Sequence, residues 1–295
     1  MKFRGHETFS IRKGWLNKGI KNIEKCPGVF LGDAGNPMDV LGIGANMVKS
    51  LRYWMLATGI ASEPLSGHRV QTLTELGKTI YDNDPYFEES GSLCLIHYEL
   101  ACNEEIATSW FVFHNAFDCI EFSEDDFQIS IRKYVRMNPE RNIPGERSIS
   151  DDFKCLINTY NHKQIKAVID PEDNIESPLT ELGLIEYLYN KNNERIYKKV
   201  MIKEEVLPDL ISLAIIIKNS NGNRELKIAS LVKDDKCLGK AFNLDMIRII
   251  NILYRLEKAG YVKVIRTAGL DVVEITTEMS YTDCIKLYYE KLNQI

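Results

Sequence analysis

The residues best suited to bind phosphate lie on a predicted helix within residues 41–60. Its apolar residues recur at helical spacing and define one buried stripe. Lys49, Ser50 and Arg52 fall off this stripe, onto the face that is expected to meet solvent. Two cations and a hydroxyl on one face can donate hydrogen bonds to the phosphates of nucleic acid. The alternative is a core helix whose two cations are only solvated, as most Lys and Arg side chains are.

A second group of donors lies near the N-terminus, where aromatic residues, glycines and cations alternate. Arg4, Arg12 and Lys13 are predicted to contact phosphate oxygens, and His6 adds a further hydrogen-bonding group. Because His6 precedes Glu7, an acid–base pair or a buried structural hydrogen bond is also compatible with this segment. We favour the structural role for His6.

A β hairpin with a basic tip is predicted to follow the helix. Residues 64–67 favour a turn, which presents His68 and Arg69, and residues 70–73 favour a strand. Residues 73–77 then begin another helix, and Asp39 is expected to cap a short helix that precedes Gly42. A helix, a hairpin and a basic tip in this order are typical of a winged helix.

The C-terminal end contains a clearer version of the same pattern. A helix is predicted from residue 242 to 260, and residues 261–266 and 271–276 alternate as two paired strands. Lys240, Asn243 and Arg266 are the candidate DNA contacts there. The local charge is nearly balanced, so this winged helix suits protein interaction equally well.

The predicted fold class is α+β, mainly α with short β hairpins. We expect a winged-helix-like domain over residues 1–88, a mainly helical domain over 89–200 and a winged-helix domain over 201–295. Within them, helices are expected at 91–117, 122–137 (capped by Ser123), 151–161, 204–218, 224–232 and 284–292. Residues 179–183 repeat residues 73–77 letter for letter, which predicts a second turn capped by a threonine, Thr180.

Charge is segregated along the chain, although the net charge is only −5. Residues 1–80 hold 11 Lys and Arg against 6 Asp and Glu, whereas residues 81–126 hold 12 acids and no Lys or Arg. This contrast favours a local basic surface over indiscriminate coating of nucleic acid.

Several classes of protein are excluded by missing patterns. The seven cysteines form no Cys-x-x-Cys pair, and Cys94, Cys102 and His97 are irregularly spaced, so we expect reduced thiols and no metal. No phosphate loop, nucleophile elbow or nuclease-like carboxylate pair is present, so neither catalysis nor a cofactor is expected. The longest apolar run is far shorter than the roughly 20 residues of a membrane span, and no signal peptide is visible, so a cytoplasmic location is expected.

Several short motifs resemble a bacterial family of unknown function. They are FRGHETF at residues 3–9, GWL at 14–16, LGIGANMV at 41–48, GKAFNL at 239–244 and TAGL at 267–270. Members of this family look like neighbours of the phosphoadenosine-phosphosulfate-reductase-like proteins of DNA phosphorothioation and bacteriophage-exclusion clusters. The resemblance covers roughly the first 80 and last 70 residues, and it supplies no catalytic motif.

The resemblance implies a DNA-binding or adaptor subunit of an anti-phage defence system. Its partners would be double-stranded DNA and a reductase-like or other defence protein, and a homodimer is possible. Two alternatives stay open. One is a protein-only scaffold or regulator of a sulfur-transfer or restriction partner, and the other is a winged-helix transcription regulator.

Overall fold

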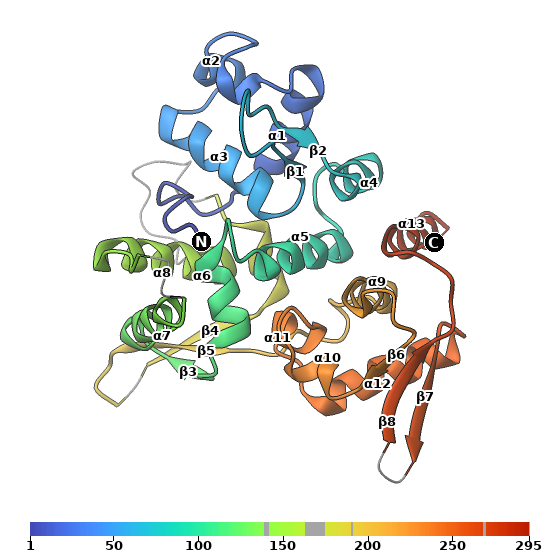
Figure 1. Cartoon of the computed structure of the whole chain (residues 1–295). Helices are drawn as coiled ribbons and strands as arrows, with labels where there is room; N and C mark the ends of the chain where they lie inside the picture. Colours follow the sequence, from blue (N-terminus) through green and yellow to red (C-terminus); the bar gives the residue numbers. More distant parts are fainter. Residues whose placement is uncertain (139–141, 163–174, 190, 268–269, 295) are drawn as a thin grey trace. The chain divides into compact units, whose positions relative to one another are not determined.

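The computed structural model describes residues 1–138, 142–162, 175–189, 191–267 and 270–294 (Figure 1). They form two compact units, Met1–Val200 and Met201–Ile295. The division into three domains, at residues 88 and 200, stays a prediction. The predicted α+β fold class is confirmed, since helices dominate and the sheets are small and antiparallel. No helix in the described part of the chain is long and apolar enough to cross a membrane.

The first unit begins with a group of helices around a very short hairpin. Its elements are α1 (Trp15–Lys25), η1 (Val29–Leu31), α2 (Pro37–Leu41), α3 (Ala45–Ala57), β1 (Ala61–Ser62), β2 (Thr72–Leu73) and α4 (Glu75–Asn83). The predicted helix within residues 41–60 is thus α3. The cap of α2 is Asn36 and not Asp39, because Pro37 starts the helix and the Asn36 side chain accepts the Met38 N–H.

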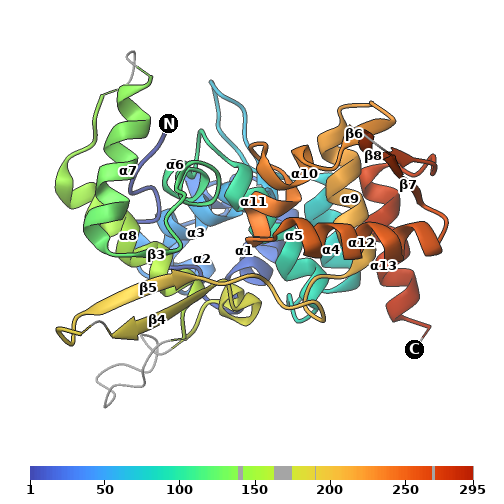
Figure 2. The same cartoon turned by 90° about the horizontal axis from the view of Figure 1, so that it is seen from below.

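The rest of the first unit is helical but also contains a sheet that the sequence analysis missed. The helices are α5 (Ser90–Cys102), α6 (Thr108–Phe111), η2 (Val112–Ala116), α7 (Glu124–Arg136), α8 (Glu146–Tyr160) and η4 (Pro178–Leu182). The strands β3 (Glu121–Phe122), β4 (Ile185–Tyr189) and β5 (Arg195–Lys199) pair in the order β3-β5-β4. Figure 2 shows β4 and β5 side by side below α7 and α8. The capping of α7 by Ser123 is confirmed, and α8 begins five residues earlier than predicted.

The repeated pentapeptide adopts two different structures. In the first copy Thr74 caps α4, and its Oγ1 accepts the Gly77 N–H at 2.9 Å, as predicted. In the second copy Thr180 lies inside η4 and is buried, while Ser177 caps the helix. The second prediction is wrong because Pro178 sets the helix start one residue after Ser177.

The second unit places a three-stranded sheet among helices. Its elements are α9 (Asp209–Ser220), β6 (Glu225–Lys227), α10 (Ser230–Lys233), α11 (Leu238–Phe242), α12 (Met246–Lys258), β7 (Val262–Thr267), β8 (Leu270–Ile275) and α13 (Tyr281–Leu292), with the strand order β6-β8-β7. The long helix and the two strands after it are confirmed. The predicted helix over residues 224–232 is wrong, because residues 225–227 pair with β8 instead.

A candidate nucleic-acid interface

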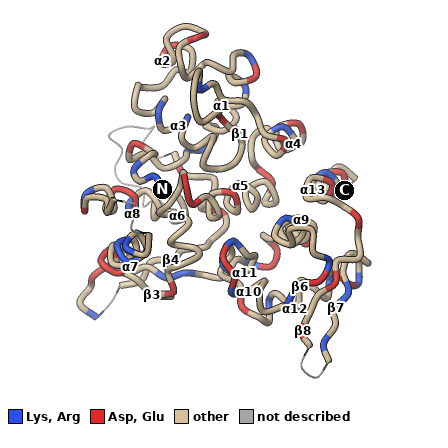
Figure 3. The backbone as a smooth tube through the Cα atoms, viewed as in Figure 1, with Lys and Arg blue, Asp and Glu red and all other residues tan. Residues whose placement is uncertain are grey.

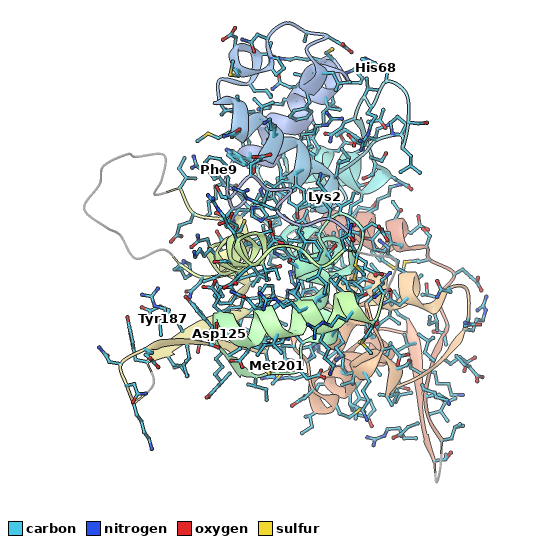
Figure 4. All side chains as sticks on the ribbon, turned by 60° about the vertical axis from the view of Figure 1, so that its left-hand side comes forward. Lys2, Phe9, His68, Asp125, Tyr187 and Met201 are labelled. Carbon is cyan, nitrogen blue, oxygen red and sulfur yellow. The ribbon has the colours of Figure 1, made fainter. Side chains whose placement is uncertain are left out.

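A pocket of about 660 Å³ opens on the first unit, between the N-terminal segment, α3 and the loop that joins β1 to β2. Five of the predicted DNA contacts line it, namely Arg4, Lys49, Arg52, His68 and Arg69. The other lining residues are Lys2, Phe3, Gly5, Glu7, Leu31, Tyr53, Leu56, Glu63 and Gly67. Figure 4 labels Lys2, from the N-terminal segment, and His68, from the loop that joins β1 to β2. Tertiary structure thus gathers cations from three separate stretches of sequence.

One wall is organised by Glu63, whose side chain is only 8% exposed. Its carboxylate accepts hydrogen bonds from Arg52 Nη2 at 2.8 Å and Nε at 3.2 Å, and it also pairs with Arg69. Arg52 Nη2 donates a further bond to the Arg69 carbonyl at 2.9 Å. Because one buried carboxylate holds both guanidinium groups, the loop tip is fixed to α3 and the two cations are oriented before any ligand arrives.

The opposite wall is the N-terminal segment, which a buried hydrogen-bond cluster fixes in place. His6 Nδ1 accepts the Thr8 N–H at 3.0 Å, so His6 Nε2 carries the proton and donates to Asp152 at 2.7 Å. Asp152 also accepts the Arg4 N–H at 2.8 Å and the Ser109 hydroxyl at 2.6 Å. The favoured structural role of His6 is confirmed, and its pairing with Glu7 is wrong.

This cluster maintains a backbone that is unusual for non-glycine residues. Arg4, Glu7 and Thr8 have φ angles of 57°, 49° and 69°, in the left-handed region. At Gly5, a Cβ atom would lie 2.6 Å from the Tyr53 ring, so only glycine fits there. Strained backbone of this kind persists only where surrounding contacts enforce it, and here it presents Arg4 and Glu7 to the pocket.

The pocket is electrostatically poised for an anion. Partial burial lowers the pKa of Lys2, and the nearby charges of Arg69 and Arg52 lower it further against the opposing effect of Glu63. Lys49 is exposed and has no ion pair among the described residues. The remaining cations are partly neutralised, since Arg4 lies 2.8 Å from Asp151 and His68 lies 2.7 Å from Asp33. An anion near Lys2 and Lys49 would therefore gain favourable interactions that the free protein leaves unused.

Three predicted contacts are corrected because their side chains are buried. His6 is held by Asp152, Arg12 lies between the rings of Phe9 and Trp15, and Ser50 is fully enclosed. Solvent does not reach these groups, so they cannot bind a phosphate in this structure. Lys13 is exposed, but it pairs with Glu181 at 2.5 Å and does not line the pocket.

The predicted contacts of the second unit lie on two elements, since Lys240 and Asn243 are at the end of α11 and Arg266 is on β7. Lys240 is in the last turn of α11 and Asn243 ends that helix with a φ of 56°. Arg266 on β7 pairs with Asp271 at 3.0 Å. On α12 the side chains of Arg248 and Arg255 bind Glu204, and Arg255 also binds Asp209. Figure 3 shows Lys and Arg interleaved with Asp and Glu along the backbone of this unit.

The exposed face of α12 is instead partly apolar. Ile247 is 69% exposed and Tyr254 is 47% exposed, on a helix whose two central arginines are engaged within the chain. Exposed apolar side chains that cluster on one helix are more typical of protein contacts than of phosphate contacts.

Lys2 and Glu63 are functional candidates that the sequence analysis missed. Lys2 directly precedes the FRGHETF motif, and Glu63 is one of few acids in a basic stretch. The sequence therefore gives only a weak indication that either residue has a function. Their importance depends on contacts across the fold, which no local pattern reveals.

The cysteines behave largely as expected. All seven are free, and four of them (Cys94, Cys155, Cys237 and Cys284) are buried. Within the described ranges no three His, Cys, Asp or Glu side chains are grouped so as to hold a metal ion.

The fold and the pocket define an α+β protein with a pre-organised basic pocket on its first unit. The chain belongs to the DUF4007 family of proteins of unknown function, whose model matches residues 3–289. Two solved structures are similar to it, one of magnesium-bound SspB (TM-score 0.83) and one of SspB (TM-score 0.81). Each is 25% identical, over 99% of this chain and 87% of the SspB chain. A comparison with curated proteins gave no match.

Proposed function

We propose that this protein is a DNA-binding subunit of a bacterial DNA phosphorothioation defence system and that the basic pocket contacts DNA. Similarity to SspB along almost the whole chain supports the link to that system, as do the family motifs. The observation that carries the DNA-binding role is the pocket itself. It brings together four Lys and Arg side chains and one histidine, each expected from sequence to contact phosphate.

The physical basis of the proposal is the release of counterions from DNA. Each phosphate that a lysine or arginine neutralises frees condensed cations, which makes binding favourable and dependent on salt. Lys49 and Lys2 are available for such contacts, while Arg52 and Arg69 keep a fixed orientation through Glu63. Two of the acids of residues 81–126 have local structural roles, since Asp84 accepts the N–H groups of Glu88 and Glu89 just before α5 and Asp126 completes the capping box of α7.

In this proposal the second unit contributes less to DNA affinity. We assign it a winged-helix arrangement on the basis of its order of helix, strand, helices and two strands, with the sheet order β6-β8-β7, in which α12 would be the recognition helix. The ion pairs of Arg248 and Arg255 leave few free cations on that helix.

A second candidate function is that of an adaptor, and the apolar face of α12 favours it. In this case Ile247 and Tyr254 would contact another defence protein, such as a reductase-like sulfur-activating enzyme. The two roles are compatible because they use different units of the chain.

The proposal is tested by measuring duplex binding as a function of salt concentration. Lys49→Ala and Arg69→Ala should each weaken binding to any duplex and lower the salt slope by roughly 0.9 per lost phosphate contact. Lys78→Ala is the matched control, because Lys78 is an exposed lysine of the same unit that does not line the pocket. An unchanged slope in both pocket variants, or an equal change in the control, would rule out the pocket as the DNA contact.

The adaptor role needs a separate measurement. Ile247→Glu should abolish co-purification with the proposed partner, a reductase-like sulfur-activating enzyme, while the affinity for duplex DNA stays unchanged. Retained co-purification would remove α12 from the partner surface.

A further inference from the structure

We propose that the interior of the pocket accepts a single nucleotide unit, a phosphate together with its sugar and base, while the exposed cations Lys49 and Arg69 also contact phosphates of the paired duplex. This inference builds on the proposed DNA-binding function and specifies what enters the pocket. The nucleotide can belong to DNA, as an extrahelical residue, or be free in solution.

The shape of the pocket is the first argument. A volume of about 660 Å³ is within the range of small-molecule sites, which extend from roughly 300 to 1,000 Å³. The backbone of a paired duplex is convex and meets a concave site only at the rim. Proteins that bind one nucleotide of DNA instead take it out of the stack and enclose it in a pocket.

The second argument is the combination of charged and apolar groups in one cavity. Lys2, Arg52 and Arg69 line this cavity together with the carboxylate of Glu63, which pairs with both arginines and leaves the Lys2 ammonium to meet a phosphate. The same cavity is lined by Phe3, Leu31 and Leu56, of which Leu31 is exposed and the other two are partly exposed. Cations alone would suffice for inorganic phosphate, whereas the apolar side chains offer a surface to a sugar and a base.

The third argument is the rigidity of the walls. Buried Asp152 fixes the N-terminal segment, and Glu63 fixes the loop tip to α3. A duplex surface can be bound by flexible lysines, since phosphate contacts alone need little geometric precision. Two independently anchored walls are more useful for a ligand of defined size, because less conformational freedom is lost when it binds.

The test uses the full chain and calorimetry with three probes: deoxyadenosine 5′-monophosphate, deoxyadenosine and inorganic phosphate. The monophosphate should bind with a stoichiometry of one, and each of the other two should bind at least roughly tenfold more weakly. Lys2→Met should weaken monophosphate binding by roughly tenfold, because it removes a charge-assisted contact, and Lys78→Met should leave it unchanged. Equal affinities for inorganic phosphate and the monophosphate, or equal affinities of the Lys2→Met and Lys78→Met variants, would overturn the inference.

Binding to two duplexes distinguishes a nucleotide that belongs to DNA from one that is free in solution. A duplex that carries one bulged adenosine should bind more tightly than its fully paired counterpart and be displaced by the monophosphate if the source is DNA. If the monophosphate binds and the two duplexes bind equally, the ligand is a free nucleotide.

The same experiments distinguish failure of this inference from failure of the proposed function. Salt-sensitive duplex binding without monophosphate binding would refute the nucleotide pocket and leave DNA binding intact. Monophosphate binding without any duplex binding would refute the proposed function and leave the pocket assignment intact.

Discussion

The replacement Asp152→Ala should destabilise the first unit strongly, whereas Asp151→Ala next to it should have little effect. Asp152 is buried and accepts hydrogen bonds from the Arg4 amide, the His6 ring and the Ser109 hydroxyl. Asp151, whose side chain is 18% exposed, lies near the guanidinium of Arg4, which is 43% exposed. The two neighbouring carboxylates therefore form a matched pair of a fully buried and a partly exposed contact.

The expected loss in free energy of unfolding of each variant follows from the environment of its carboxylate. Each donor left without a partner costs about 1–3 kcal/mol, but the three share one acceptor and their costs do not add. Hydrogen bonds to an ionised carboxylate contribute about 1.5–3 kcal/mol each, and for three donors that share this acceptor we expect a total of about 3–5 kcal/mol for Asp152→Ala. A single ion pair to a largely exposed guanidinium contributes about 0–1 kcal/mol, which is the expectation for Asp151→Ala.

Thermal unfolding followed by tryptophan fluorescence reports this difference selectively. The chain has three tryptophans, and all lie in the first unit, at positions 15, 54 and 110. In a domain of this size 1 kcal/mol shifts Tm by about 2–4 °C, so Asp152→Ala should lower Tm by about 6–20 °C and Asp151→Ala by less than about 4 °C. Below both transitions Asp152→Ala should still bind DNA more weakly, because Arg4 is no longer held at the pocket. Equal shifts in Tm for the two variants would refute the buried anchor.

Three further predictions use the same assays. Gly5→Ala should cost about 1–3 kcal/mol and weaken DNA binding, because its Cβ atom would lie 2.6 Å from the enclosed ring of Tyr53; an unchanged Tm would contradict this. Because the pKa of Lys2 is lowered, its ammonium loses its proton at a lower pH than an ordinary lysine. DNA affinity should therefore fall early in an alkaline titration, and Lys2→Met should abolish that fall. Hydrogen bonds from Ser123 lower the pKa of Asp126, so its stabilising effect is present above the unfolded-state pKa and is lost as pH falls through the folded one. The difference in Tm between the wild type and Asp126→Asn should accordingly shrink in acid, and a constant difference would count against the capping role.

Local signals in the sequence were sufficient for most helices and for the C-terminal hairpin. Ser123 and Thr74 each start a helix through a hydrogen bond that spans three residues, so the chemistry is contained within one turn. The pairing of β7 with β8 is equally local, because the two alternating strands are separated by only a few residues in the sequence and Thr267 pairs with Leu270. Such elements depend on neighbours in sequence, and the sequence alone determined them.

Pairing between distant segments was not predictable in this way. β5 pairs with β3, which lies more than 70 residues earlier, and β6 pairs with β8 across α10, α11 and α12. The repeated pentapeptide makes the same point, since identical residues cap α4 in one place and lie within η4 in the other. Tertiary contacts override short-range preference in these cases.

The candidate site likewise has features that the sequence alone predicts and features that only the tertiary structure reveals. Residue type and spacing alone identified Arg4, Lys49, Arg52, His68 and Arg69 as possible phosphate ligands, because cations near turns and on helix faces are visible in the sequence. Only the tertiary structure decided that these five line one pocket, that Lys2 and Glu63 lie among them, and that three other predicted ligands are buried. The physical reason is that helical periodicity assumes one buried face, whereas α3 is buried on most sides from Ser50 onward while Lys49, one residue earlier, stays in solvent.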